Sequence, residues 1–159
     1  MSVKDFVQQR RDDFIAMRRD FHMYPEPAWL EYRSASKVAE KLISLGYDVA
    51  LGADVLDLDS RMGLPSEEVM KAAMARAMDE GADPELVEKM GYGKTAIVAT
   101  MKFSDDGPVV AFRADMDSND VIESKASNHI PAKIGFRSRH DKAMHACGHD
   151  THMTMGLGL

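Results

Sequence analysis

The chain has 159 residues, of which 45% are hydrophobic and 29% charged, and its formal net charge is −6. This composition is ordinary for one globular domain with a core of its own, and the negative charge argues against a nucleic-acid-binding surface. A single cysteine excludes a disulfide within the chain. The N-terminus is charged from its fourth residue, with no signal-peptide pattern, and no apolar run is long enough to span a bilayer. We therefore expect a cytoplasmic protein that does not engage a membrane.

Two amphipathic helices are predicted in the first third of the chain. Apolar residues recur at helical spacing over Val3 to Met23, and a second stripe covers Leu30 to Leu45. The sequence YPEP ends the first helix, because prolines do not fit a helix interior. Gly46 is a suitable C-cap for the second. The next residues, Tyr47 to Gly52, are predicted to form a short strand.

A methionine-rich segment follows and is predicted to be helical. Ser66 is a plausible N-cap, Gly81 ends the helix, and Pro84 can open a further short one. Methionines at such spacing more often fill a core than form a binding surface. The residues at helical spacing are Met70, Ala73, Met74, Ala77 and Met78.

Two strands are predicted next, Thr95 to Phe103 and Pro108 to Asp117, joined by the turn sequence SDDG. The second strand is almost continuously apolar until Arg113, as expected of a strand buried on both faces. It ends in two aspartates. The segment 118–143 has no clear period and is predicted to be a long loop, and a last helix is expected from Thr151.

The ligands that transition metals prefer gather near the C-terminus. The only cysteine, Cys147, lies among three histidines, His145, His149 and His152. Thiolate and imidazole suit zinc and similar ions, and the glycine between Cys147 and His149 allows a turn that brings both side chains to one point. The carboxylate of Asp117 or Asp150 can accept the second ring N–H of a ligating histidine.

Each of these residues has an ordinary structural explanation when it is taken alone. A lone cysteine usually packs in a core, lone histidines are usually structural, and Asp115 and Asp117 could cap the next segment. A Cys–His nucleophile pair is a further alternative, although such partners are normally distant in sequence. Taken together, one cysteine and three histidines so close in sequence favour a metal site.

The motifs resemble a known family. MHACGHDTH, the upstream AFRADMD and the N-terminal MRRDFHMYPEPAWLEYRSA resemble the metal-dependent aminoacylase/carboxypeptidase family of amidohydrolases. The segment from SRMGLPSEEVM to GYGKTAIVATM resembles the p-aminobenzoyl-glutamate hydrolase branch of that family. The resemblance covers essentially the whole chain, and the Cys-Gly-His motif is specific.

The resemblance implies a role for each matching residue. Cys147 would bridge two divalent metal ions, zinc or manganese, and His149 would be a terminal ligand to one of them. Asp117 would support the metal site from outside the ligand set, and His145 and Asp150 would shape the turn, with Asp150 a possible catalytic residue. In the family, metal-activated water attacks an amide carbonyl while a glutamate acts as general base.

Two further residues that match the family's motifs carry less specific roles. The resemblance gives only weak support for His152 as a site residue. Arg113 would organise the end of the strand.

Some features depart from the family pattern. Ser118 and Asn119 stand where small apolar residues are usual, and Thr151 stands where glycine is common. A Glu–Glu pair, further histidine ligands and a dimerisation domain would all lie downstream of residue 159.

The resemblance therefore implies an α/β fold over residues 1–159, the incomplete N-terminal part of a zinc-peptidase-like catalytic domain with helices packed on a mixed sheet. Its apolar edges would leave it marginally stable or paired with another chain.

The resulting hypothesis is a metal-dependent amidohydrolase that cleaves an N-acyl or p-aminobenzoyl amino acid, with the chain alone inactive. A homodimer or pairing with a sister subunit is expected. The alternative is a truncated, non-catalytic metal-binding or subunit-interaction module, and a third possibility is a plain α/β domain with an incidental cluster. Coding sequence for the missing ligands beyond residue 159 would discriminate between the first two.

Overall fold

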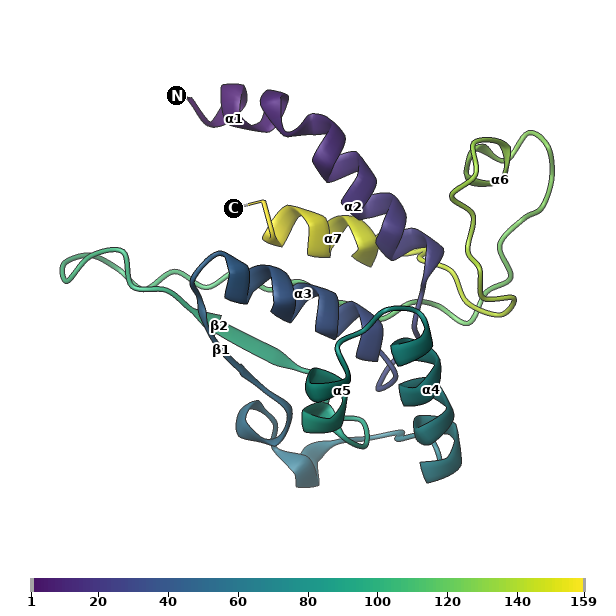
Figure 1. Cartoon of the computed structure of the whole chain (residues 1–159), viewed down its shortest axis with the longest axis horizontal. Helices are drawn as coiled ribbons and strands as arrows, with labels where there is room; N and C mark the ends of the chain where they lie inside the picture. The colour runs from purple at the N-terminus through teal and green to yellow at the C-terminus, as the bar shows by residue number, and fades with distance from the viewer. Residues whose placement is uncertain (1, 159) are drawn as a thin grey trace. The chain divides into compact units, whose positions relative to one another are not determined.

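The structure is a computed structural model that describes residues 2–158. The described residues form two compact units. One contains the chain up to Pro27 together with the segment from Arg113 onward, and the other runs from Ala28 to Phe112. Figure 1 shows the elements of both units along the chain.

The unit from Ala28 to Phe112 packs helices against a small antiparallel sheet. Strands β1 (Asp48–Leu51) and β2 (Ile97–Thr100) pair with Asp48 opposite Thr100 and Leu51 opposite Ile97. The α/β class is confirmed, but the sheet of the described residues is antiparallel rather than mixed. The other elements are α3 (Tyr32–Ser44), the 3-10 turns η1 (Gly52–Val55) and η2 (Leu58–Ser60), α4 (Glu67–Asp79) and α5 (Pro84–Met90).

The helices of this unit begin and end where their caps predict. The Ser66 hydroxyl accepts the Val69 N–H at the start of α4, and Pro84 follows the N-cap Asp83 of α5. Gly46 follows α3 with a φ of +88°, a conformation that favours glycine. The predicted stripe faces the core only in part: Met70, Ala73 and Ala77 are buried, whereas Met74 and Met78 are half-buried.

The other unit is mainly helical. It contains α1 (Val3–Gln9), α2 (Arg11–Met23), the single turn α6 (Ile130–Lys133) and α7 (His149–Gly156). The predicted helix from Val3 to Met23 is interrupted at Arg10, whose φ of −99° and ψ of 8° depart from helical values. Helix α2 packs along α7, with Phe21 and Met153 buried. Helices from the two ends of the chain thus build one core.

The predicted strand from Pro108 to Asp117 is wrong. These residues form no regular element, and Val109 and Val110 are 99% and 84% exposed. A strand exists only when a neighbour satisfies its backbone groups, and among the described residues β1 and β2 pair only with each other. High local β propensity is therefore not enough to form a strand here. The segment stays uncovered, and uncovered apolar surface was expected of this chain.

Among the described residues, no helix is both long enough and apolar enough to cross a membrane.

Candidate metal centre

The turn that leads into α7 is fixed by backbone contacts and by one side chain. Asn119 and Met144 form an antiparallel bridge, and the Asn119 side-chain oxygen accepts the Cys147 N–H at 3.1 Å. Gly148 then adopts a φ of +96° as the N-cap of α7, a value that glycine tolerates without strain. His149 is consequently the first residue of the helix. Asn119, which departs from the family pattern, thus holds this turn in place.

Three side chains bring possible metal-ligand atoms together. Within the described part of the chain, Asp115, His149 and His152 each offer one such atom, and these atoms lie within 4.8 Å of one another. His149 and His152 stand one turn apart on α7, with ring centroids 5.2 Å apart. Arg113 donates two hydrogen bonds to Oδ1 of Asp115, at 3.1 and 2.7 Å, which hold this carboxylate in place.

The His149 ring contacts Asp117 through its Nδ1 atom. Its Nδ1 lies 2.7 Å from the Asp117 carbonyl oxygen and 3.0 Å from the Asp117 carboxylate. Both partners are acceptors, so Nδ1 carries the proton and the lone pair is on Nε2. Contacts of this kind fix the tautomer of a ligating histidine, and the role of Asp117 in supporting a metal site stays a prediction.

The remaining predicted residues take other positions. Cys147 is exposed and lies outside the group of three, so its role as a bridging ligand stays a prediction. His145 is buried and neither ring nitrogen has a hydrogen-bond partner among the described residues. Burial, as the main cause, lowers the pKa of His145 to about 4, so its ring is neutral near pH 7. Asp150 is fully buried, within a set of charged groups.

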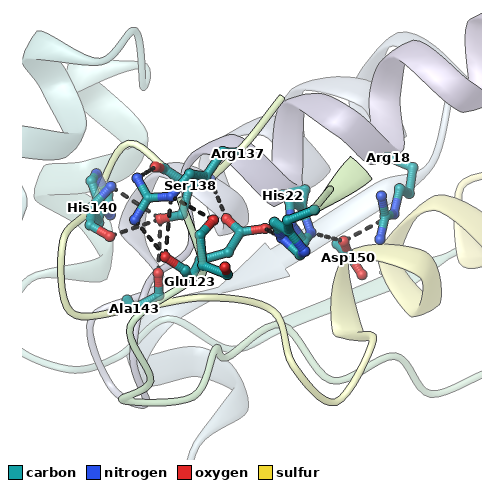
Figure 2. Close-up of polar contacts among 10 residues, drawn as sticks. Arg18, His22, Glu123, Arg137, Ser138, His140, Ala143 and Asp150 are labelled. Atoms are coloured by element: carbon teal, nitrogen blue, oxygen red, sulfur yellow. Dashed lines mark hydrogen bonds and ion pairs between the residues drawn. The ribbon is translucent and has the colours of Figure 1, made fainter. Parts of the chain in front are cut away.

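His22 and Glu123, to which the sequence patterns assigned no role, meet Asp150 in the core of this unit (Figure 2). The His22 ring uses both nitrogens: Nδ1 lies 2.7 Å from Asp150, and Nε2 lies 3.0 Å from Glu123. Arg18, one turn before His22 on α2, also contacts Asp150 at 3.0 Å. His22 belongs to the motif MRRDFHMYPEP, which was the available signal, whereas the loop around Glu123 gave none.

These contacts shift the pKa values in opposite directions. Burial alone would lower the pKa of His22, but the hydrogen bonds to Asp150 and Glu123 outweigh it and raise the pKa above its ordinary value. Burial alone would raise the pKa of Glu123, yet the hydrogen bonds from His22, His129 and the Ser138 N–H lower it. Both shifts favour a protonated His22 between ionised carboxylates.

The stabilising effect of His22 should depend on pH. A histidine whose folded pKa is raised contributes its full stabilisation below its unfolded pKa, about 6.5, and loses it as the pH rises through the folded value. The difference in unfolding free energy between the wild type and His22→Gln should therefore shrink as the pH rises from about 6.5 through the folded pKa of His22. Urea unfolding of both proteins from mildly acidic to alkaline pH measures it. A difference that stays constant over this range would contradict the raised pKa.

The residues present fit a divalent metal ion. Two imidazoles and one carboxylate form a set of nitrogen and oxygen ligands that suits zinc or manganese, and their ligand atoms already lie close together. Ligand atoms of one zinc ion lie about 2 Å from it, so Asp115, His149 and His152 would have to move closer together than they are here to share one ion.

Comparison with known proteins finds relatives that are named as hydrolases. No protein-family model matches the chain. It is 45% identical to indole-3-acetyl-aspartic acid hydrolase of Enterobacter agglomerans over 157 residues, and 44% identical over 158 residues to a protein of Escherichia coli strain K12 that is named as one subunit of p-aminobenzoyl-glutamate hydrolase. Each alignment covers 99% of this chain and 36% of the relative, so the chain spans about a third of the length of these proteins.

A solved structure shares both sequence and fold with the chain. The crystal structure of an aminobenzoyl-glutamate utilization protein from Klebsiella pneumoniae is 44% identical and superposes with a TM-score of 0.73, covering 76% of this chain and 30% of that one. A thermostable carboxypeptidase of Saccharolobus solfataricus is 33% identical over 98% of this chain. The α/β arrangement of the described residues thus matches part of the Klebsiella pneumoniae structure.

Proposed function

We propose that the whole protein hydrolyses an amide bond of an N-acyl or p-aminobenzoyl amino acid. The premise is that this chain is a homologue of p-aminobenzoyl-glutamate hydrolase and related amidohydrolases. Asp115, His149 and His152 would hold a divalent ion, zinc or manganese. The close approach of their ligand atoms is the observation that carries this proposal. When bound, such an ion polarises an amide carbonyl and activates water.

The residues of this chain contribute positioning to that reaction. Asp117 holds His149 in one tautomer through the contact at Nδ1, and Arg113 holds the carboxylate of Asp115. Both contacts reduce the conformational freedom that the ligands would otherwise lose on binding an ion. Cys147 is proposed as a further ligand, with a second ion in the whole protein. The other residues of the site, including the general base, would come from outside the 159 residues, so the chain alone would be inactive.

Metal removal tests this function. We expect the whole protein to cleave p-aminobenzoyl-glutamate, to lose this activity after treatment with a chelator, and to regain it when Zn²⁺ or Mn²⁺ is added back. Release of the aromatic amine can be followed by absorbance, with N-acetyl and N-benzoyl amino acids as a panel for the acyl group. Activity that survives complete metal removal would contradict the proposal.

A second role, in pairing with another chain, is favoured by the uncovered apolar segment. Val109, Val110 and Phe112 are exposed, and an uncovered apolar segment with β propensity can pair with a strand of another chain. One relative carries the word subunit in its name. Pairing of the whole protein with itself or with a sister subunit is therefore proposed, either beside the catalytic function or in place of it. Sedimentation of Val110→Lys against the wild type tests it, and an unchanged mass would argue against this segment.

A further inference from the structure

The buried imidazole of His22 joins three separate parts of the chain. It stands on α2, its Nδ1 faces Asp150 on α7 at 2.7 Å, and its Nε2 faces Glu123 in the loop after residue 118 at 3.0 Å (Figure 2). His22 is 3% exposed, and both carboxylate side chains are completely buried. The contacts span 128 and 101 residues of sequence. His22 thus connects the N-terminal and C-terminal segments of this unit.

The surrounding donors favour the ionised form of both carboxyl groups. Asp150 accepts a hydrogen bond from the Thr151 N–H at 2.8 Å and forms an ion pair with the Arg18 side chain, in addition to the contact with His22. Glu123 accepts the Ser138 N–H and lies 2.8 Å from His129 Nε2. Groups that receive so many donors act as acceptors. Each nitrogen of the His22 ring then faces an acceptor, which favours the imidazolium form.

A protonated His22 supplies a positive charge between two buried carboxylates. Asp150 and Glu123 bring two negative charges into the core, and Arg18 supplies one positive charge from a side chain that is 33% exposed. With a neutral His22, the remaining imidazole against Glu123 would be that of His129, which is 28% exposed, and a buried carboxylate is unfavourable without a nearby counter-charge. Phe136 closes the remaining side, with its ring centroid 5.4 Å from that of His22.

We propose that His22 is a positioning residue of the metal centre: as an imidazolium clamped between Glu123 and Asp150, it fixes the first turn of α7 and therefore the placement of His149 and His152. This inference rests on the proposed function. Asp150 is the second residue of α7 and accepts the Thr151 N–H, so its carboxylate is tied to the backbone of that turn. His149 precedes it directly, and His152 completes the same turn.

Only an imidazolium fits this position. It carries two N–H donors on opposite edges of a rigid ring, one for each carboxylate. A glutamine at position 22 can donate from only one end of its amide, and the amide oxygen would face the other carboxylate. His22→Gln therefore removes one donor and the positive charge while it keeps a polar side chain of moderate size.

Zinc affinity tests the role against a matched control. In the whole protein we expect His22→Gln to weaken Zn²⁺ binding by about 10-fold or more, the range found when partners of metal ligands are removed. His129→Gln also deletes a histidine contact to Glu123 but leaves Asp150 untouched, so its affinity should equal that of the wild type. Competition with a chromophoric chelator gives the dissociation constants. If His22→Gln binds Zn²⁺ like the wild type, the positioning role is overturned, whereas a wild type that binds no Zn²⁺ overturns the proposed function as well.

A spectroscopic measurement keeps the inference testable even if His22→Gln does not fold. Nitrogen-15 chemical shifts of the histidine rings distinguish an imidazolium from the two neutral tautomers. In the wild type, His22 should keep both ring nitrogens protonated at a pH above the ordinary histidine value of about 6.5. Shifts of a neutral tautomer at that pH would overturn the clamp independently of any metal.

Discussion

Replacing His149 by alanine is expected to weaken Zn²⁺ binding by more than about 100-fold, beyond the roughly 10- to 100-fold effect typical of residues that only support a ligand. The substitution removes the lone pair on Nε2, which the contact between Nδ1 and Asp117 leaves available. It also removes the side chain that stands beside His152 in the group of three. Competition between the protein and a chromophoric chelator measures the change.

His129→Ala is the matched control for this substitution. His129 is the N-cap residue of α6 and lies outside the group of three, so its loss should leave Zn²⁺ affinity unchanged. The two variants remove the same side chain from one unit of the structure. Equal losses in both would mean that His149 affects affinity only through stability, and the ligand assignment would be wrong.

Replacing Glu123 by leucine should lower the free energy of unfolding by about 3–5 kcal/mol, the usual cost of breaking a buried ion pair by removing one partner. The substitution leaves the His22 imidazolium without one counter-charge and the Ser138 N–H without its acceptor. Glu123 has no exposed side-chain surface, so water cannot replace these contacts. Urea unfolding followed by circular dichroism measures the change.

Glu67→Leu is the control for this loss of charge. Glu67 lies in the first turn of α4, is 58% exposed and pairs with the exposed Lys71 at the next turn. Exposed pairs of this type contribute little, so the unfolding free energy should stay nearly the same. A small effect in Glu123→Leu, similar to that in Glu67→Leu, would show that the buried set of charges does not stabilise the fold.

Helices α3, α4 and α5 could be predicted because their signals are local. They follow from apolar spacing together with Ser66, Pro84 and Gly46, each of which acts within one turn of its own position. The segment Pro108 to Asp117 has an equally clear local signal for a strand, but strand formation depends on a partner that no local pattern supplies. The prediction therefore failed where the structure depends on a neighbour.

The same limit applies to the site. The proximity of His149 and His152 follows from their spacing on a helix, and the motif alone indicated them as a metal-binding cluster. The inclusion of Asp115 and the clamp at His22 depend on contacts between segments that are distant in sequence, and one sequence contains no record of such pairs. Cys147 is exposed and lies outside the group of three, so its role as a ligand stays a prediction.

The most direct test of the metal centre is X-ray absorption spectroscopy at the zinc edge of the zinc-loaded whole protein. We expect a bound ion whose nearest neighbours include imidazole nitrogens and carboxylate oxygen, and a spectrum that loses imidazole scattering in His149→Ala. Sulfur scattering in addition would establish Cys147 as a further ligand. A protein that retains no zinc, or an ion with no imidazole neighbours, would contradict the assignment of Asp115, His149 and His152 as a metal centre.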